Sequence, residues 1–309
     1  MFLIRAVLVI LLPFSALLTD TFQKNSGPIN PAAHVSSEND SALLEHGAPR
    51  TLERVGLING EIKVVSYNIR YRSGNDLKKL LELFKEDPEI GNAVILGLQE
   101  VDRHKKRTGK TNTARVIADE LRMNYAWAAP PSARSTDEEE TGVAIMSPFP
   151  ISDVRRMVLP HNGPNQRRRV ALAATVRIHD TDVRVYSMHG ETRIDMDKKL
   201  EQMSTLLADI KRYPKTMPVI LVGDLNTWEP DAARKTIKLF SDAGLHTPFG
   251  SQKTFSRRAL FIPIEFRLDW VWLRGFKVLT YGIDKKINLS DHFPLWVNVM
   301  LPPKKAADR

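Results

Sequence analysis

The chain has 309 residues, no cysteine and a formal net charge of +9, from 45 Lys and Arg against 36 Asp and Glu. About 42% of the residues are hydrophobic, which excludes a wholly disordered chain and suffices for a sizeable core. The absence of Cys excludes disulfides, thiolate zinc sites and cysteine nucleophiles. Any metal must then be held by oxygen and nitrogen ligands, which favours hard cations such as Mg²⁺. The basic excess favours a polyanionic partner.

Residues 1–18 have the pattern of an export signal. Arg5 precedes the apolar run Ala6–Leu12, and a second apolar stretch ends at Leu18. The segment is shorter than a comfortable bilayer span and fits a signal peptide. No clean small-x-small triplet follows, so an uncleaved N-terminal anchor stays open, with membrane contact through this leader only. We therefore expect a protein that is secreted, periplasmic or tethered to a membrane.

The remaining chain divides by composition. Residues 19–60 are rich in Ser, Asn, Pro, Gly and charge without sustained periodicity, which predicts a disordered linker. Residues 61–302 contain no internal repeat and no second linker, so we expect one domain, followed by a basic tail over residues 303–309.

The first half of this domain is expected to alternate strands and helices. Apolar runs predict strands over residues 62–67, 93–98 and 142–146. Apolar residues at helical spacing predict a helix over residues 77–84 that stops before Pro88, and a second helix over residues 112–121.

The second half begins with a hairpin. Two β-rich runs over residues 170–178 and 183–188 are joined by a polar turn. Asp195 can cap a helix that continues to Ile210. Strands are expected over residues 219–222, 268–273 and 293–300. Hairpins mixed with βα units predict an α/β (α+β) sandwich of two sheets.

Polar side chains adjoin the ends of five of these strands. Any one of them alone is explained by a turn or a solvated surface. Together they are expected to gather in one cleft. These residues are Asn68, Glu100, His189, the pair Asp224 and Asn226, and the pair Asp291 and His292.

These motifs make the sequence resemble the endonuclease/exonuclease/phosphatase superfamily, the DNase I-like metal-dependent phosphodiesterases. The resemblance extends over the whole domain, in family order. It implies a four-layer α/β/β/α sandwich with its site at the strand ends. The motifs that carry it are Val65–Arg70, Leu98–Asp102, Gly142–Ser147, Ser187–His189, Gly223–Asn226, Leu268–Val271 and Ser290–Pro294.

Phosphate ester hydrolysis requires neutralised phosphoryl oxygens, an aligned water and a stabilised leaving oxygen. Glu100 is the natural ligand for Mg²⁺ or Mn²⁺, because a hard carboxylate suits a hard ion. The resemblance implies that Asn68 and Asp291 join it, directly or through water.

The resemblance also implies the catalytic roles. Asp224 would orient or deprotonate the attacking water, and Asn226 would donate its amide to a phosphate oxygen. His189 and His292 would contact the phosphate or move protons. An imidazole needs a partner that fixes its tautomer, and Asp269 is expected to serve His292 in this way.

Two basic runs each have two interpretations. Arg167, Arg168 and Arg169 form either a solvated loop or a phosphate clamp at the cleft, in which Arg167 and Arg169 bind the substrate. The run from Arg103 to Lys110 is either a soluble face or a contact for an extended polyanion.

Two further segments differ from the simplest family pattern. Gly190, Glu191 and Thr192 follow His189, where many members carry a leucine-type residue, so the local loop is altered. The apolar loop over residues 257–266 either contacts a membrane or packs on a sheet edge.

The leading functional hypothesis is a monomeric, exported, Mg²⁺-dependent phosphodiesterase that acts as a nuclease. The alternative is a sphingomyelinase-like or inositol-phosphate-type phosphoesterase of the same fold. A non-catalytic binding protein is the third hypothesis, and it is disfavoured because every expected catalytic position is filled.

Overall fold

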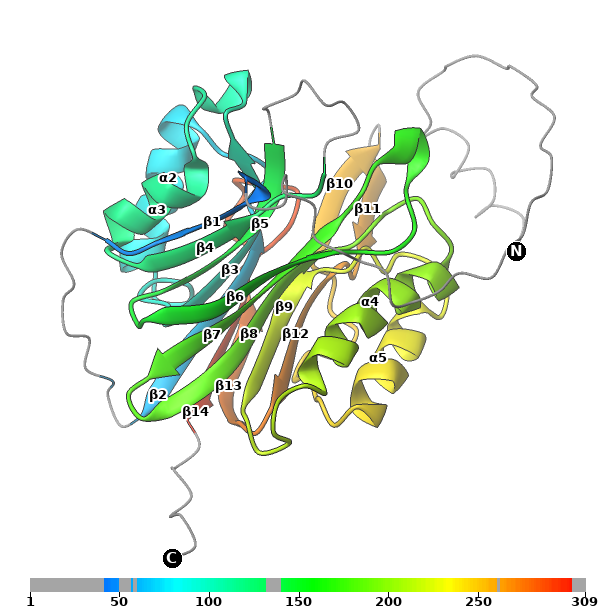
Figure 1. The fold of residues 1–309 in the computed structure, drawn as a ribbon. Helices are drawn as coiled ribbons and strands as arrows, with labels where there is room; N and C mark the ends of the chain where they lie inside the picture. The colour runs from blue at the N-terminus through cyan, green and yellow to red at the C-terminus, as the bar shows by residue number, and fades with distance from the viewer. Residues whose placement is uncertain (1–41, 50–56, 58–59, 132–139, 260–261, 302–309) are drawn as a thin grey trace, which may run out of the picture.

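The computed structural model describes residues 42–49, 57, 60–131, 140–259 and 262–301. Within them two β-sheets pack face to face, and the helices lie on the two outer faces (Figure 1). The first sheet has the order β1 (Leu44–Gly47), β4 (Asn124–Ala128), β5 (Glu140–Ser147), β3 (Ile95–Arg103), β2 (Glu61–Asn68), β14 (Leu295–Met300) and β13 (Lys277–Ile283). The second sheet has the order β12 (Asp269–Arg274), β9 (Val219–Asp224), β8 (Thr181–His189), β7 (Val170–Ile178) and β6 (Ile151–Val158).

The helices complete a four-layer α/β/β/α sandwich. α2 (Gly74–Glu86) and α3 (Thr113–Leu121) cover the first sheet, while α4 (Met196–Ile210) and α5 (Ala232–Asp242) cover the second (Figure 1). Short 3₁₀ turns lie at Lys106–Thr108 and Pro164–Gln166. A separate hairpin, β10 (Phe255–Ala259) with β11 (Ile262–Phe266), stands beside the second sheet.

Three apolar clusters hold the layers together. Val222 lies between the sheets, Trp127 lies under α2 and α3, and Trp272 lies under α4 and α5, all fully buried. Gly97 in β3 packs against β9 of the other sheet. A Cβ atom there would lie 2.2 Å from the Val222 side chain, so this contact between β3 and β9 requires glycine.

The period of two along each strand determines which residues face the other sheet. Val64 in β2 and Val222 in β9 point into the cluster between the sheets, whereas their neighbours Val65 and Leu221 point to the helices. Residues two or four positions further along each strand point the same way. The last residues of these strands, including Asp224, therefore face the space between the sheets.

The structure confirms most of the predicted elements. The hairpin is β7 paired antiparallel with β8, and the first predicted helix is α2. Asn112 caps α3 by accepting a hydrogen bond from the Arg115 N–H. Asp195 occupies the N-cap position of α4 but makes no capping hydrogen bond with its side chain.

The prediction of a disordered linker over residues 19–60 is wrong at Leu44–Gly47. This segment forms β1 and pairs antiparallel with β4. Its Glu45 carboxylate accepts a hydrogen bond from the Tyr125 hydroxyl at 2.5 Å and pairs with Arg103 at 3.3 Å. Sequence periodicity cannot report such distant partners. The predicted leader and the basic tail lie outside the described residues.

The apolar loop predicted over residues 257–266 is instead most of the β10–β11 hairpin. Its backbone is joined to the strand-end residues, because the Ser256 N–H donates to the carbonyl oxygen of Asp291 at 2.9 Å. Ile262 is 58% exposed. No helix in the described part of the chain is long and apolar enough to cross a bilayer.

Candidate active site

Three strand ends of the second sheet bring their polar residues side by side. β8 and β9 run parallel with His189 opposite Asp224, and β12 runs antiparallel to β9 with Asp269 opposite Asp224. The three side chains are at most 8% exposed. The register therefore assembles an imidazole and two carboxylates at one edge.

The first sheet supplies Asn68 and Glu100 across from them. The alternation along β3 would aim Glu100 at the helices, but the pairing with β5 shifts between Gln99 and Val101. Glu100 occupies this irregularity with a positive φ of 55°. The bulge re-aims its carboxylate, which accepts a hydrogen bond from the Asn68 side-chain amide at 3.3 Å.

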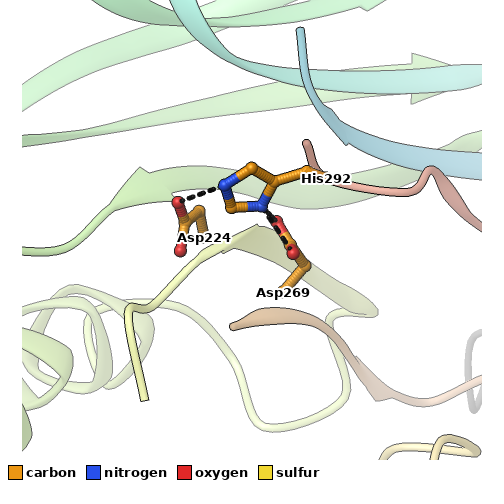
Figure 2. Close-up of side chains that lie close together, drawn as sticks. All are labelled: Asp224, Asp269 and His292. Carbon is orange, nitrogen blue, oxygen red and sulfur yellow. Dashed lines mark hydrogen bonds and ion pairs between the residues drawn. The ribbon is translucent and has the colours of Figure 1, made fainter. Parts of the chain in front are cut away.

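His292 lies between the two buried carboxylates (Figure 2). Its Nδ1 is 2.8 Å from Oδ2 of Asp269, and its Nε2 is 3.7 Å from Oδ2 of Asp224. The Thr254 hydroxyl also donates to Asp269 at 2.7 Å. The expected partnership of Asp269 with His292 is present in the structure and fixes the direction of the imidazole ring.

Burial and mutual charge shift the pKa values of Asp224 and His292 away from their ordinary values. Burial raises the pKa of Asp224 to about 7, with a further raising contribution from Asp269. Burial alone would lower the pKa of His292, but the charges of Asp269 and Asp224 outweigh it and raise the value to about 10. A cationic His292 beside Asp269 and Asp224 is thus the favoured state at neutral pH.

Nearly all the predicted site residues line one cavity of about 450 Å³. Asn68 and Asp269 lie behind its wall, bonded to lining residues. A larger cavity, of about 550 Å³, lies against α2 and contains none of the predicted residues. The lining of the first cavity includes Arg70, Glu100, Arg167, Arg169, His189, Asp224, Asn226, Asp291 and His292.

Glu100 and Asp291 place two carboxylates at this cavity, whose oxygen atoms are suitable ligands for a metal ion. Asp291 pairs with Arg70 at 3.1 Å, and the Asn68 amide group bridges Glu100 and Asp224. Carboxylate oxygens open to a cavity fit a hard divalent cation such as Mg²⁺. The tighter group of Asp224, Asp269 and His292 has ligand atoms within 4.8 Å of one another. Because Nδ1 of His292 is already bonded to Asp269, we interpret that group as a hydrogen-bonded Asp269–His292 pair with the Asp224 carboxylate facing Nε2 at 3.7 Å.

Asn226 is held in the cavity wall by its own loop. Its backbone N–H donates to Oδ1 of Asp224, and its side-chain amide donates to the carbonyl oxygen of Gly190. Lys199 of α4 donates to the carbonyl oxygen of Asn226 at 2.6 Å and pairs with Glu229. Sequence reasoning missed Lys199, because a lysine on a helix gives no signal that it is buried.

Arg167 and Arg169 reach the cavity, but both guanidiniums pair with the fully buried Glu191. Burial alone would raise the pKa of Glu191, yet hydrogen bonds from Arg167 and the charge of Arg169 lower it to about 2. The departure at Glu191 noted in the sequence is therefore the buried counter-charge of these two arginines.

The basic run after Glu100 divides into structural and exposed members. Arg103 is buried against Glu140, and Arg107 pairs with the buried Asp102 at 2.6 Å. Arg107 also stacks on the Tyr71 ring, 3.5 Å from its centroid. Lys106 and Lys110 are exposed.

An apolar wall, which the sequence motifs did not indicate, closes one side of the cavity. Phe255 and Phe266 come from the β10–β11 hairpin, and Leu268 and Trp228 complete the wall. The Phe255 ring meets the His292 imidazole edge to face at 5.0 Å. The wall thus places apolar surface beside the buried charges.

The Glu191 ion pairs give a prediction for acid stability. A folded-state pKa of about 2 against an ordinary 4.5 means that Glu191 stabilises the fold above pH 4.5. This contribution, about 3 kcal/mol, is lost as pH falls from 4.5 toward 2. We expect Glu191→Gln to remove this part of the pH dependence of unfolding by urea. Glu120→Gln, a change at an exposed carboxylate, should leave it in place; equal curves for Glu191→Gln and the original chain would contradict the prediction.

The fold is a DNase I-like α/β/β/α sandwich, and its strand ends carry a buried group of Asp224, Asp269 and His292 beside a cavity lined by carboxylates. The sequence matches the model of the Endonuclease/Exonuclease/phosphatase family over residues 65–292. The chain therefore belongs to this family, whose superfamily comprises phosphoester hydrolases.

Individual relatives are distant. The UPF0294 protein VV2535 of Vibrio vulnificus (strain YJ016) is 30% identical over 105 residues, which are 34% of this chain and 34% of that protein. The match thus spans about a third of this curated relative.

Solved structures share the fold at low identity. An endonuclease/exonuclease/phosphatase from Beutenbergia cavernae DSM 12333 is 17% identical with a TM-score of 0.61, covering 78% of this chain and 72% of that chain. A family protein from Leptotrichia buccalis C-1013-b is 16% identical with a TM-score of 0.61, covering 78% and 100%.

Proposed function

We propose that the protein is a divalent-metal-dependent phosphodiesterase of the nuclease type. The observation that carries this proposal is the buried group of Asp269, His292 and Asp224, in which His292 and Asp224 line one cavity together with the carboxylates of Glu100 and Asp291. Acid–base groups opposite a hard-cation donor set form the arrangement that phosphoester hydrolysis requires.

Each residue has a defined task in this proposal. Glu100 and Asp291 would hold Mg²⁺ or Mn²⁺, which when bound neutralises phosphoryl charge and stabilises the leaving oxygen. Asn68, whose side-chain amide donates to Glu100, would orient that carboxylate. Asp224 accepts a proton from the attacking water and orients it. His292, kept cationic by Asp269, donates a hydrogen bond from Nε2 to a phosphoryl oxygen. Asn226 binds a second phosphoryl oxygen through its amide.

Charge around the cavity favours an extended polyanion as substrate. Arg70 and Arg167 line it with side chains 40% and 47% exposed, and Arg257 of the hairpin lines it as well. The chain has a net charge of +9, and these arginines add local positive charge that attracts phosphate backbones.

A second candidate function is hydrolysis of a phospholipid headgroup, as in sphingomyelinase-like enzymes. The observation in its favour is the apolar wall of Phe255, Phe266 and Leu268, which continues into a hairpin whose Ile262 is exposed. The same wall can stack against a nucleobase, so the substrate must be decided by experiment.

The test is a panel of substrates assayed with and without Mg²⁺. We expect cleavage of plasmid DNA or single-stranded RNA and of bis(p-nitrophenyl) phosphate, with none in EDTA. Hydrolysis of sphingomyelin liposomes without hydrolysis of nucleic acid would favour the second candidate. No hydrolysis of any phosphoester at any divalent-metal concentration would contradict the proposed activity.

The exposed lysines after Glu100 give a further prediction. Tyr71, under Arg107, follows the cavity residue Arg70, so this loop borders the cavity. Replacing Lys106 and Lys110 together with Ala should reduce the slope of log affinity for DNA against log salt by about 2. Turnover of bis(p-nitrophenyl) phosphate should change little.

Fluorescence anisotropy with a labelled oligonucleotide at several salt concentrations measures this slope. Lys215→Ala with Lys238→Ala serves as the matched control, because both are exposed lysines outside the loop that borders the cavity. The same loss of slope in the control would show that the effect reflects net charge and not a local contact.

A further inference from the structure

The two histidines of the site have chemically opposite partners on Nδ1. His292 places this atom against the Asp269 carboxylate, whereas Nδ1 of His189 lies 3.3 Å from Nη1 of Arg169. A carboxylate accepts hydrogen bonds and a guanidinium only donates them. Nδ1 therefore carries a proton in His292 and must be an unprotonated acceptor in His189.

Arg169 is fixed in place by Glu191. Nε of Arg169 donates to Oε2 of Glu191 at 3.1 Å, and Arg167 and the backbone N–H of Arg193 also donate to this carboxylate. The Glu191 side chain is fully buried. Gly163 packs directly on it, since a Cβ atom at this glycine would lie 2.5 Å from Cδ of Glu191. This packing and these hydrogen bonds hold the carboxylate in position against Arg169.

The other groups around His189 favour its neutral form. Burial lowers the pKa of His189 well below its ordinary value, and the charges of Arg169, His292 and Arg167 lower it further. Asp224 is the opposing charge, with Oδ2 at 3.6 Å from Nε2, and it does not reverse this direction. The single ring proton then resides on Nε2, which points into the cavity toward Asp224.

We propose that Arg169 locks His189 as the Nε2–H tautomer, so that His189 donates a hydrogen bond to a phosphoryl oxygen and transfers no proton. Glu191 is a positioning residue that acts through Arg169. The phosphoryl contact rests on the proposed function, whereas the tautomer does not. Two histidines that look equivalent in the sequence thereby acquire different roles: His292 carries a proton on Nδ1 beside Asp269, and His189 is a donor through Nε2.

The tautomer is measured directly in the ¹⁵N-labelled full chain at pH 7, without metal or substrate. Long-range ¹H–¹⁵N spectra distinguish protonated from unprotonated ring nitrogens. The signals of the two rings are assigned by their loss: one set disappears in His189→Gln and another in His292→Gln. We expect His189 to be protonated on Nε2 alone and His292 to carry a proton on Nδ1. A His189 ring protonated on Nδ1, or on both nitrogens, would overturn the proposal.

Variants test whether Glu191 and Arg169 cause this state. Glu191→Gln removes the charge that orients Arg169, and we expect a mixture of His189 tautomers. Arg169→Met removes the donor and leaves Glu191 paired with Arg167, so it gives the same readout if Glu191→Gln does not fold. Arg167→Ala is the matched control, because Arg167 shares Glu191 but makes no hydrogen bond with His189 among the described contacts. An unchanged tautomer in both test variants, or an equal change in the control, would refute the role of the Arg169 contact.

Activity provides a separate readout. With bis(p-nitrophenyl) phosphate and Mg²⁺, Glu191→Gln is expected to lower kcat about tenfold with little change in KM. An unchanged kcat would contradict the positioning role of Glu191. If the tautomer is found in a chain that hydrolyses no phosphoester, the proposed function fails and the tautomer assignment stands.

Discussion

Replacing Asp224 by Asn is expected to lower kcat for bis(p-nitrophenyl) phosphate by about 10³-fold and to leave KM nearly unchanged. The carboxylate is the group that takes a proton from water in the proposed reaction, and burial raises its pKa to about 7, close to the working pH. An amide of the same shape keeps Oδ1 as the acceptor for the Asn226 N–H but cannot accept a proton from water.

Steady-state kinetics with saturating Mg²⁺ measure this effect, and unfolding by urea checks that the variant is folded. Asp242→Asn on the exposed face of α5 is the matched control, and its turnover should equal that of the original chain. A kcat of Asp224→Asn within tenfold of the original value would exclude Asp224 as the base.

Removing divalent cations should have the second large effect. We expect EDTA to reduce phosphodiester hydrolysis to background and Mg²⁺ to restore it. Glu100→Gln should lower kcat/KM at least about 100-fold and raise the Mg²⁺ concentration needed for half-maximal rate. The reason is that Glu100 is the carboxylate that the β3 bulge aims into the cavity.

A Mg²⁺ titration of the rate separates loss of metal affinity from loss of chemistry. Glu120→Gln changes an exposed carboxylate that pairs with Lys85 and should leave the titration unchanged. Full activity in EDTA, or an identical Mg²⁺ dependence in Glu100→Gln, would show that the oxygen-rich donor set is not a metal site.

The sequence predicted the central strands well because their signal is local. β2, β7, β8 and β9 are short apolar runs, and their periodicity or composition identifies them without knowledge of neighbours. β6 was missed, because its Arg155 and Arg156 interrupt the alternation and its residues are only partly buried. β1 was missed, because it is an edge strand whose pairing depends on β4, about 80 residues away.

The site was predictable to a similar degree. The motif residues Glu100, His189, Asp224 and His292 line one cavity, as expected from strand ends that share an edge. The roles assigned to them remain predictions. Arg167 and Arg169 show the limit of the approach, since the sequence offered a phosphate clamp or a solvated loop and neither interpretation included Glu191 as their partner.

By itself the sequence determined which residue types stand at the strand ends. The period of two then turns Asp224 toward the opposite sheet, whereas Glu100 reaches the cavity only through the bulge in β3. Only the tertiary structure decided what each polar group faces. His189 and His292 are the same amino acid, one at the end of β8 and the other just before β14, yet one meets a guanidinium and the other a carboxylate. The physical reason is that side-chain direction follows from local backbone geometry. Protonation and charge instead follow from neighbours that are distant in the chain and are brought together when both sheets pack.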